Sequence, residues 1–239
     1  MRIDVAFTPE EEVSAPLAIV VDVLRATSTI AQALASGYER VLCAGEIDEA
    51  RELRRTVPDS LLGGEREARR IEGFDVGASP RELLDARART LILSTTNGTR
   101  AILAAAAHAD EVVLGSLLNL DAIVRHATGR SADVAVVCAG FKGAFALDDA
   151  YCAGRIVQLL DGERSDAAIA AELVARAFPT ALAGLNARTY GPPGLEEDIA
   201  FCARESVLEV VPRFSRMSGT AAEIVAEVWN PAGATTEGD

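Results

Sequence analysis

The sequence predicts an α/β fold, a three-layer α/β/α arrangement with a mostly parallel or mixed central sheet. Strand-like and helix-like patterns alternate to about residue 160, which is typical of a parallel sheet with helices on both faces. The strand patterns are short apolar runs rich in β-branched residues, as expected for strands buried on both faces. The 239 residues show no internal repeat and no linker, so we expect one domain over residues 1–229 and a disordered tail over 230–239.

The composition limits the classes of partner. The formal net charge of −13 argues against nucleic acid and anionic membranes as partners. There is no apolar signal core, and no run reaches the roughly 18 apolar residues of a spanning helix. The four cysteines lack C-x-x-C spacing, so we expect free, buried thiols in a cytoplasmic protein. The two histidines, His108 and His126, are too few for a His-rich metal site, and we expect both on helix surfaces.

Residues 17–30 organise the prediction, because they place polar groups at the end of a buried strand. Asp22 and Arg25 directly follow the apolar run, and Thr27 or Ser28 is expected to cap the next helix. Ligands of open α/β sheets bind outside the carboxyl ends of the strands, and a helix N-terminus there suits an anion. The stretch therefore predicts a site for a small anion and possible metal.

The rest of the N-terminal half is read from its hydrophobic period. Residues 2–7 alternate and suggest a strand, residues 40–44 are another buried run, and residues 47–57 have helical spacing. A short strand begins at Leu61, followed by a long polar loop and a helix that starts at Ser79-Pro80. Polar loops of this length are often functional.

The C-terminal half continues the alternation and then becomes mainly helical. Asn97-Gly98 is read as a tight turn between a strand and a helix. Further strands are expected over residues 90–96, 111–116 and 133–140, and helices over 99–105, 119–127, 147–160 and 165–178.

Beyond residue 178 we expect elements that cover an edge of the sheet. These are a rigid loop at residues 190–194, a helix that begins near Glu196, an edge strand over 207–211 and a last helix over 220–228. The acids at 196–198 are interpreted as first-turn residues that favour the helix dipole.

Polar side chains recur at four strand ends and form the candidate site. They are Asp22 and Arg25, Glu46, Glu65 and Arg66, Asn97 with Thr99 and Arg100, and Lys142 with Asp148 and Asp149. Carboxylates and guanidiniums that converge on one sheet edge suit a divalent cation with a phosphate or carboxylate. Each group also has a structural interpretation as a turn cap, an ion pair or a helix-dipole residue. The repetition at four strand ends favours the functional one.

Several enzyme classes lack their motifs in this sequence. There is no phosphate-binding G-x-x-x-x-G-K-[ST], no strand–G-x-G-x-x-G–helix and no G-x-S-x-G. A cysteine-based phosphatase would need an Arg six residues after Cys138, where Ala144 stands. A haloacid-type phosphatase would need an Asp two residues after Asp22, where Leu24 stands.

Several longer motifs resemble the 2-phosphosulfolactate phosphatase family, in order and over nearly the whole chain to about Pro212. They are residues 20–30, 64–66, 73–77, 95–101, 137–140, 145–149, 152–154 and 198–202. The resemblance implies a Mg²⁺-dependent phosphatase that hydrolyses 2-phospho-3-sulfolactate to 3-sulfolactate and phosphate, a step of coenzyme M biosynthesis. The chain departs from the family pattern at Ala78, where the family usually has Asn, and substrate choice could differ there.

The resemblance and the strand-end pattern together give each residue a hypothetical role. The catalytic candidates are Asp22, Arg25, Glu65 and Asp75, and the candidate ligands of Mg²⁺ are Asp22, Glu65, Asp75 and Asp148. The candidates for binding phosphate and sulfonate besides Arg25 are Thr27, Arg66, Asn97, Thr99 and Arg100. Direct attack by water and a phosphoenzyme on Asp22 both stay open.

The expected partner is a small anionic phosphorylated substrate, with neither nucleic acid nor membrane, and a homodimer is the default assembly. Two alternatives stay open. One is a phosphatase of the same fold that acts on another small phosphorylated hydroxy acid. The other is a non-catalytic protein that binds small anions, which metal-dependent phosphate release would rule out.

Overall fold

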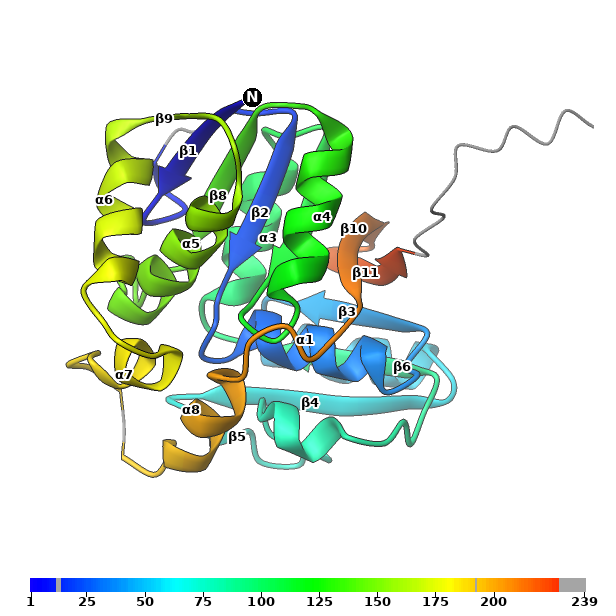
Figure 1. Cartoon of the computed structure of the whole chain (residues 1–239). Coiled ribbons are helices and arrows are strands. Elements are labelled where there is room, and N and C mark those ends of the chain that lie inside the picture. Colours follow the sequence, from blue (N-terminus) through cyan, green and yellow to red (C-terminus); the bar gives the residue numbers. More distant parts are fainter. Residues whose placement is uncertain (12–13, 192, 228–239) are drawn as a thin grey trace, which may run out of the picture.

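The computed structural model describes residues 1–11, 14–191 and 193–227, and it confirms the predicted α/β fold (Figure 1). Eleven strands of the described chain form a mixed, mostly parallel sheet in the order β5-β4-β6-β3-β11-β10-β7-β2-β8-β1-β9. The strands are β1 (Arg2–Ala6), β2 (Leu17–Val21), β3 (Arg40–Ala44), β4 (Ser60–Arg66), β5 (Arg69–Arg70), β6 (Thr90–Ser94), β7 (Glu111–Gly115), β8 (Val134–Cys138), β9 (Glu163–Arg164), β10 (Val211–Ser218) and β11 (Ala221–Glu227). The helices are α1 (Ala26–Ala35), α2 (Ile47–Thr56), α3 (Gly98–Ala106), α4 (Leu120–Arg130), α5 (Leu147–Leu159), α6 (Asp166–Arg176), α7 (Ala181–Asn186) and α8 (Glu196–Cys202), with a 3₁₀ turn, η1 (Pro80–Leu83). The tail predicted over 230–239 lies outside the described residues.

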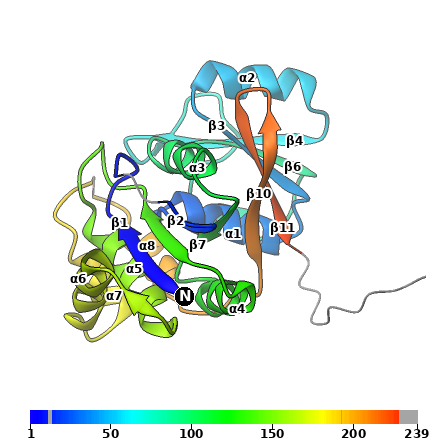
Figure 2. The same ribbon diagram turned by 90° about the horizontal axis from the view of Figure 1, so that it is seen from above.

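The sheet consists of two parallel parts joined by an antiparallel hairpin. β4, β6 and β3 are parallel and form the first half-sheet. β7, β2, β8 and β1 are parallel and form the second half-sheet. Between them, β11 is antiparallel to β3, β10 is antiparallel to β11, and β7 is antiparallel to β10. Figures 1 and 2 show this hairpin between half-sheets whose strands point in different directions.

The hairpin replaces two predicted elements. The edge strand expected over 207–211 is wrong, because residues 207–210 have no regular structure and β10 begins at Val211 inside the sheet. The helix expected over 220–228 is also wrong, since that segment is β11, paired on both sides. Its alanines and glutamates favour a helix in isolation, but burial between two strands decides the conformation. The buried Glu223 is accommodated by Arg40, whose Nη1 lies 3.0 Å from its carboxylate.

The helices pack on both faces of the sheet. α1 and α3 lie between the half-sheets, because their core joins Val20 and Leu114 of the second half to Val41 and Leu93 of the first. α4, α5 and α6 cover the outer face of the second half-sheet, and α2 covers the outer face of the first. α1 follows β2 and α3 follows β6, so the N-termini of both inner helices lie where the carboxyl ends of the two half-sheets meet.

The position of His126 also differs from the prediction. Its side chain is buried and does not lie on the helix surface. Its Nε2 lies 3.1 Å from Glu111 Oε1, and its Nδ1 lies 3.2 Å from Glu227 Oε2. Arg130 contacts both carboxylates at 2.8–2.9 Å, so a guanidinium and an imidazole lie between the two acids. These side chains join α4, β7 and β11. His108 is exposed, as expected.

The Glu111 cluster leads to a prediction about stability and pH. Burial alone would raise the pKa of Glu111, but Arg130 and His126 hold it below its usual value. A carboxyl group with a lowered folded-state pKa stabilises the fold above its unfolded pKa, and that contribution is lost as the pH falls through the folded value. We expect Glu111→Gln to lower the free energy of unfolding by about 1–3 kcal/mol at neutral pH. The difference should shrink below about pH 4.

Urea denaturation of wild type and variant at both pH values measures this effect. Glu39→Gln is the matched control, because its ion pair with Arg89 lies at the exposed surface, where such pairs add little. A Glu111 variant as stable as wild type at neutral pH would contradict the assignment.

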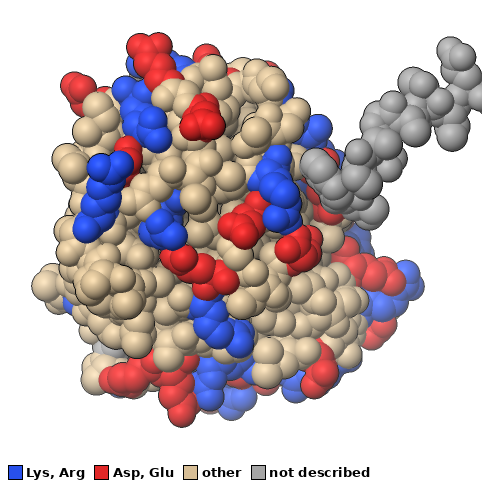
Figure 3. Space-filling view, viewed as in Figure 1, with Lys and Arg blue, Asp and Glu red and all other residues tan. Residues whose placement is uncertain are grey.

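The surface mixes both signs of charge. On the face seen in Figure 3, acidic and basic side chains alternate and do not gather into a broad basic area. No described helix has both the length and the apolar character needed to cross a bilayer. Any attraction of an anion by this face therefore has to come from local groups.

Candidate active site

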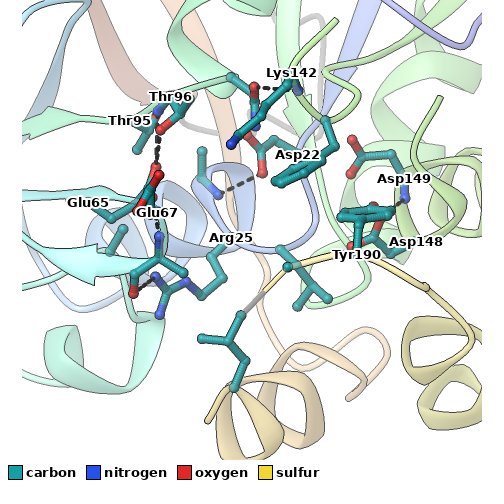
Figure 4. A pocket seen from close by; sticks show the side chains of 18 of the residues that line it. Asp22, Arg25, Glu65, Glu67, Thr95, Thr96, Lys142, Asp148, Asp149 and Tyr190 are labelled. Atoms are coloured by element: carbon teal, nitrogen blue, oxygen red, sulfur yellow. Dashed lines mark hydrogen bonds between the residues drawn. The ribbon is translucent and has the colours of Figure 1, made fainter. Parts of the chain in front are cut away.

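A cavity of about 600 Å³ opens where the carboxyl ends of the two half-sheets meet. Its lining comes from the end of β4, from the segments that follow β2, β4, β6 and β8, and from the start of α5. Four residues between α7 and α8 complete it: Arg188, Tyr190, Gly191 and Leu195. Figure 4 shows Asp22 in the middle, with Glu65 and Thr96 on one side and Asp148 and Tyr190 on the other. The predicted convergence of strand ends therefore exists, with contributions from both half-sheets.

Asp22 is held at the N-terminus of α1. Its Oδ1 accepts a hydrogen bond from Ala26 N at 3.2 Å. Thr27 Oγ1 accepts from Asp22 N at 3.1 Å and lies 2.9 Å from Asp22 O, to which it donates. Thr27 thus supports the backbone of Asp22, and neither it nor Ser28 acts as the predicted side-chain cap of α1. Asp22 Oδ2 has no hydrogen-bond partner among the described residues.

Burial raises the pKa of Asp22 to about 7, and the charges of Asp148 and Glu65 act in the same direction. Because burial and neighbouring carboxylates disfavour the charged form, a cation beside Asp22 would favour its ionisation. The environment of Asp22 therefore suits a carboxylate that binds a cation.

Asp148 and Asp149 are neighbours in the sequence but have different hydrogen-bond partners. Asp149 accepts from Val23 N at 2.9 Å and from Gly140 N at 3.0 Å, so it fastens the ends of β2 and β8 together. Asp148 Oδ1 accepts from the Tyr190 hydroxyl and from Asp149 N, whereas its Oδ2 has no partner in the described part of the chain. Burial raises the pKa of both carboxyl groups. Asp148 is thus the second carboxylate with a free oxygen at the cavity.

Glu65 lines the cavity, but each of its oxygens already has protein donors. Oε1 accepts from Thr96 N and Oγ1 at 3.0 and 2.9 Å, and Oε2 accepts from Ala68 N at 2.8 Å. Arg66 likewise donates to Gly45 O and to Ser94 Oγ, both at 3.1 Å. Both residues therefore hold the β4–β5 turn against the end of β6 while facing the cavity.

Positive groups surround these carboxylates. The cationic side chains that line the cavity are Arg25, Arg66, Arg69, Lys142 and Arg188. The backbone N–H groups of Gly98 and Thr99, in the first turn of α3, have no intrahelical acceptor. Asn97 precedes them, and its Oδ1 accepts from Lys142 N at 3.2 Å. A helix N-terminus with nearby arginines and a lysine is a suitable site for an anion.

The structure brings together some of the predicted residues and leaves the others outside. Those that line the cavity are Asp22, Arg25, Glu65, Arg66, Asn97 and Asp148. Those that do not are Thr27, Asp75, Thr99 and Arg100. Asp75 is exposed and accepts from Leu62 N at 2.8 Å, which holds its loop on β4. Arg100 pairs with Glu10 at 3.1 Å on the surface, and Thr99 Oγ1 lies 3.4 Å from Thr95 Oγ1.

Arg188 and Tyr190 are site residues that the sequence did not reveal. They lie in an irregular segment without a hydrophobic period, so nothing indicated that it folds over the cavity. The Tyr190 ring stacks on Phe141 with centroids 4.5 Å apart. Burial raises the pKa of Tyr190, so its hydroxyl stays a neutral donor to Asp148.

Comparison with known proteins identifies the family. The 2-phosphosulpholactate phosphatase family matches residues 4–216. A protein of Symbiobacterium thermophilum named "Probable 2-phosphosulfolactate phosphatase" is 40% identical over 221 residues, which cover 87% of this chain and 94% of the relative. Proteins of the same name from Caldanaerobacter subterraneus and Deinococcus radiodurans are 38% and 37% identical, covering 82% and 89% of this chain and 86% and 92% of the relatives. The resemblance seen in the sequence is thereby confirmed, and the chain belongs to the 2-phosphosulfolactate phosphatase family.

Proposed function

We propose that this protein hydrolyses 2-phospho-3-sulfolactate to 3-sulfolactate and phosphate, as a cytoplasmic step of coenzyme M biosynthesis. The observation that carries the proposal is the pair of free oxygens, Asp22 Oδ2 and Asp148 Oδ2, in one cavity with the N-terminus of α3 and several cationic side chains. The names of the relatives support the substrate.

The donors at the cavity fit Mg²⁺. No His or Cys is among the lining residues, and the free donors are carboxylate oxygens, which hard cations prefer. Asp22 and Asp148 would hold the ion, and Glu65 would stand beside it, already bonded to its own loop. When bound, Mg²⁺ would neutralise charge on the phosphoryl oxygens. Asp75 receives no ligand role in this proposal, because it lies outside the cavity.

The residues of the chain supply position and charge for the reaction. The phosphoryl group is bound beside Asn97 and Lys142, at the N-terminal end of α3, while Arg25 and Arg66 face the same space. Charge that spreads over the phosphoryl oxygens in the transition state is thereby stabilised. Asp22 either orients the attacking water or attacks phosphorus itself, and water then hydrolyses the aspartyl phosphate. In both cases the P–O bond to the lactate oxygen breaks, and that oxygen takes up a proton.

The remaining charges of the substrate also find partners. A sulfonate and a carboxylate on the same small molecule need further cations, and Arg69, Lys142 and Arg188 line the rest of the cavity. In an acidic protein these side chains supply the local attraction. The stacked rings of Tyr190 and Phe141 form an apolar part of the cavity wall.

One observation favours a second substrate of the same class. Ala78, which replaces the usual Asn of the family pattern, lines the cavity, and its carbonyl accepts from Thr29 Oγ1 at 2.8 Å. The missing side chain leaves room and removes an amide at the cavity wall. Another small phosphorylated hydroxy acid is therefore the second candidate.

The test is phosphate release from 2-phosphosulfolactate, 2-phospholactate and phosphoglycerate, with Mg²⁺ and with EDTA. We expect turnover that EDTA abolishes, that added Mg²⁺ restores, and that is fastest on the sulfonate. Turnover of only the other two esters would establish the second candidate. No turnover by folded, Mg²⁺-loaded protein would leave the non-catalytic anion binder.

A further inference from the structure

Arg25 is fixed by the protein at two of its donors. Its side chain is 8% exposed, Nη1 donates to Asp198 Oδ2 at 2.5 Å, and Nη2 donates to Ala68 O at 3.1 Å. A guanidinium carries five N–H donors, so most of them stay free for a ligand in the cavity that Arg25 lines. Of the two partners, Ala68 lines the cavity, whereas Asp198 holds Arg25 from outside it.

Asp198 is the charged one of these two partners. Its side chain is also 8% exposed, and it does not line the main cavity but a smaller one, of about 340 Å³, on the other side of Arg25. Its second oxygen, Oδ1, accepts from Ser79 Oγ at 2.6 Å. Ser79 in turn accepts from Arg81 N at the start of η1. Both oxygens of Asp198 are thus fixed, and α8 and η1 are joined to the end of β2.

We propose that Asp198 is a positioning residue for the reaction, acting through Arg25, and this inference rests on the proposed function. A buried ion pair repays its desolvation only when its geometry is good and its remaining polar groups find partners. Both oxygens of Asp198 have partners, and the free donors of Arg25 are left for a bound anion. An arginine without such a partner samples many rotamers and loses entropy when it binds an anion. Asp198 removes that cost in advance and directs the fork of Arg25 at the phosphorylated substrate.

Residues 196–198 were interpreted as acids that favour the helix dipole. Asp198 does not fit this interpretation, because it is the buried partner of Arg25. Glu197 sits on the same turn as Asp198, but its side chain is 78% exposed and pairs with Arg81 at 2.6 Å. Arg81 Nη1 also lies 3.7 Å from Asp198 Oδ1, so a change at Glu197 would reach Asp198 through Arg81. The control is Glu196→Gln on the same turn, because this exposed side chain accepts only from Gly194 N among the described residues.

The first experiment measures kcat and KM for 2-phosphosulfolactate, beside the dissociation constant of inorganic phosphate by calorimetry. We expect Asp198→Asn to lower kcat/KM by about 10- to 100-fold, chiefly through KM, and to weaken phosphate binding to a similar degree. Asp198→Glu should recover part of the loss, because it restores the charge. Glu196→Gln should stay within about twofold of wild type. Ser79→Ala, which removes one hydrogen bond to Asp198, should give a smaller loss and serves if Asp198→Asn fails to fold.

A double-mutant cycle separates positioning from general stability. In an Arg25→Ala background, Asp198→Asn should change kcat/KM by less than about twofold, because the residue through which it acts is gone. Additive losses in the cycle, or full activity of Asp198→Asn, would overturn the inference. If wild type turns over no ester, the proposed function fails, and the inference then stands or falls on whether Asp198→Asn weakens binding of inorganic phosphate.

Discussion

Asp22→Asn should lower kcat for the phosphate ester by about 10²–10⁴-fold, since Asp22 lines the cavity and its free oxygen is the group proposed to act on the phosphoryl group or to bind the cation. The amide keeps the shape of the side chain and the acceptor for Ala26 N. Steady-state kinetics with Mg²⁺ in excess measure the loss. Calorimetric titration with Mg²⁺ then shows whether it comes from lost metal binding or from lost chemistry.

Stability should change in the opposite direction. Burial and neighbouring carboxylates raise the pKa of Asp22 to about 7, so its ionisation opposes folding when no cation is present. A raised folded-state pKa means that the metal-free wild type loses this part of its stability as the pH rises from its unfolded value towards the folded one. In EDTA near neutral pH, Asp22→Asn should therefore melt no lower than wild type.

Asp75→Asn is the control for the assignment of Asp22 to the active site. Asp75 lies outside the cavity, so this variant should leave kcat nearly unchanged. A large loss in Asp75→Asn with normal activity in Asp22→Asn would reverse the assignment.

The parts of the site that could be predicted are those that follow buried strands. Apolar runs show where strands end, and the polar residues after them, Asp22, Glu65 and Asn97, do face one cavity. The same rule failed for Arg100, because one turn of α3 directs it to the surface beside Glu10. Asp75 was suggested by the family resemblance and not by this rule, and its side chain accepts from Leu62 N within β4, outside the cavity. A pattern along the chain places a residue near the sheet edge but does not set the direction of its side chain.

Long-range partners could not be predicted at all. Tyr190 and Asp198 meet Asp148 and Arg25 across 42 and 173 residues of sequence, from segments without a strong period. The hairpin β10–β11 failed for a related reason, since the Ala- and Glu-rich β11 has helix formers that only the neighbouring strands override. A prediction that misses this hairpin gives one continuous parallel sheet. With it, strand direction reverses between β3 and β7, and two half-sheets supply one site.

The contact between the two half-sheets can be tested at Gly98. A Cβ on this residue would lie 2.4 Å from Ala26 Cβ and 2.9 Å from Asp22 Oδ2. Helix propensity favours Ala over Gly by about 1 kcal/mol, but Ala26 Cβ is part of α1 and has no flexible end that could move aside. The overlap must therefore push apart the N-termini of α1 and α3. We expect Gly98→Ala to cost about 1–3 kcal/mol of stability, in spite of the gain in propensity.

Activity should suffer more than stability. The phosphoryl group is to be held by α3 while Asp22 is held by α1, so separating the two helices moves the reacting groups relative to each other. A displacement on the order of 1 Å can cost about 100-fold in rate, and we expect kcat of Gly98→Ala to fall by about that factor. Gly45→Ala is the matched control, because its Cβ would meet only Glu49 Oε2, at 3.9 Å. Kinetics and urea denaturation of both variants measure the effects. A Gly98→Ala protein with wild-type kcat would mean that the close approach of α1 and α3 is not needed to align the carboxylate with the anion site.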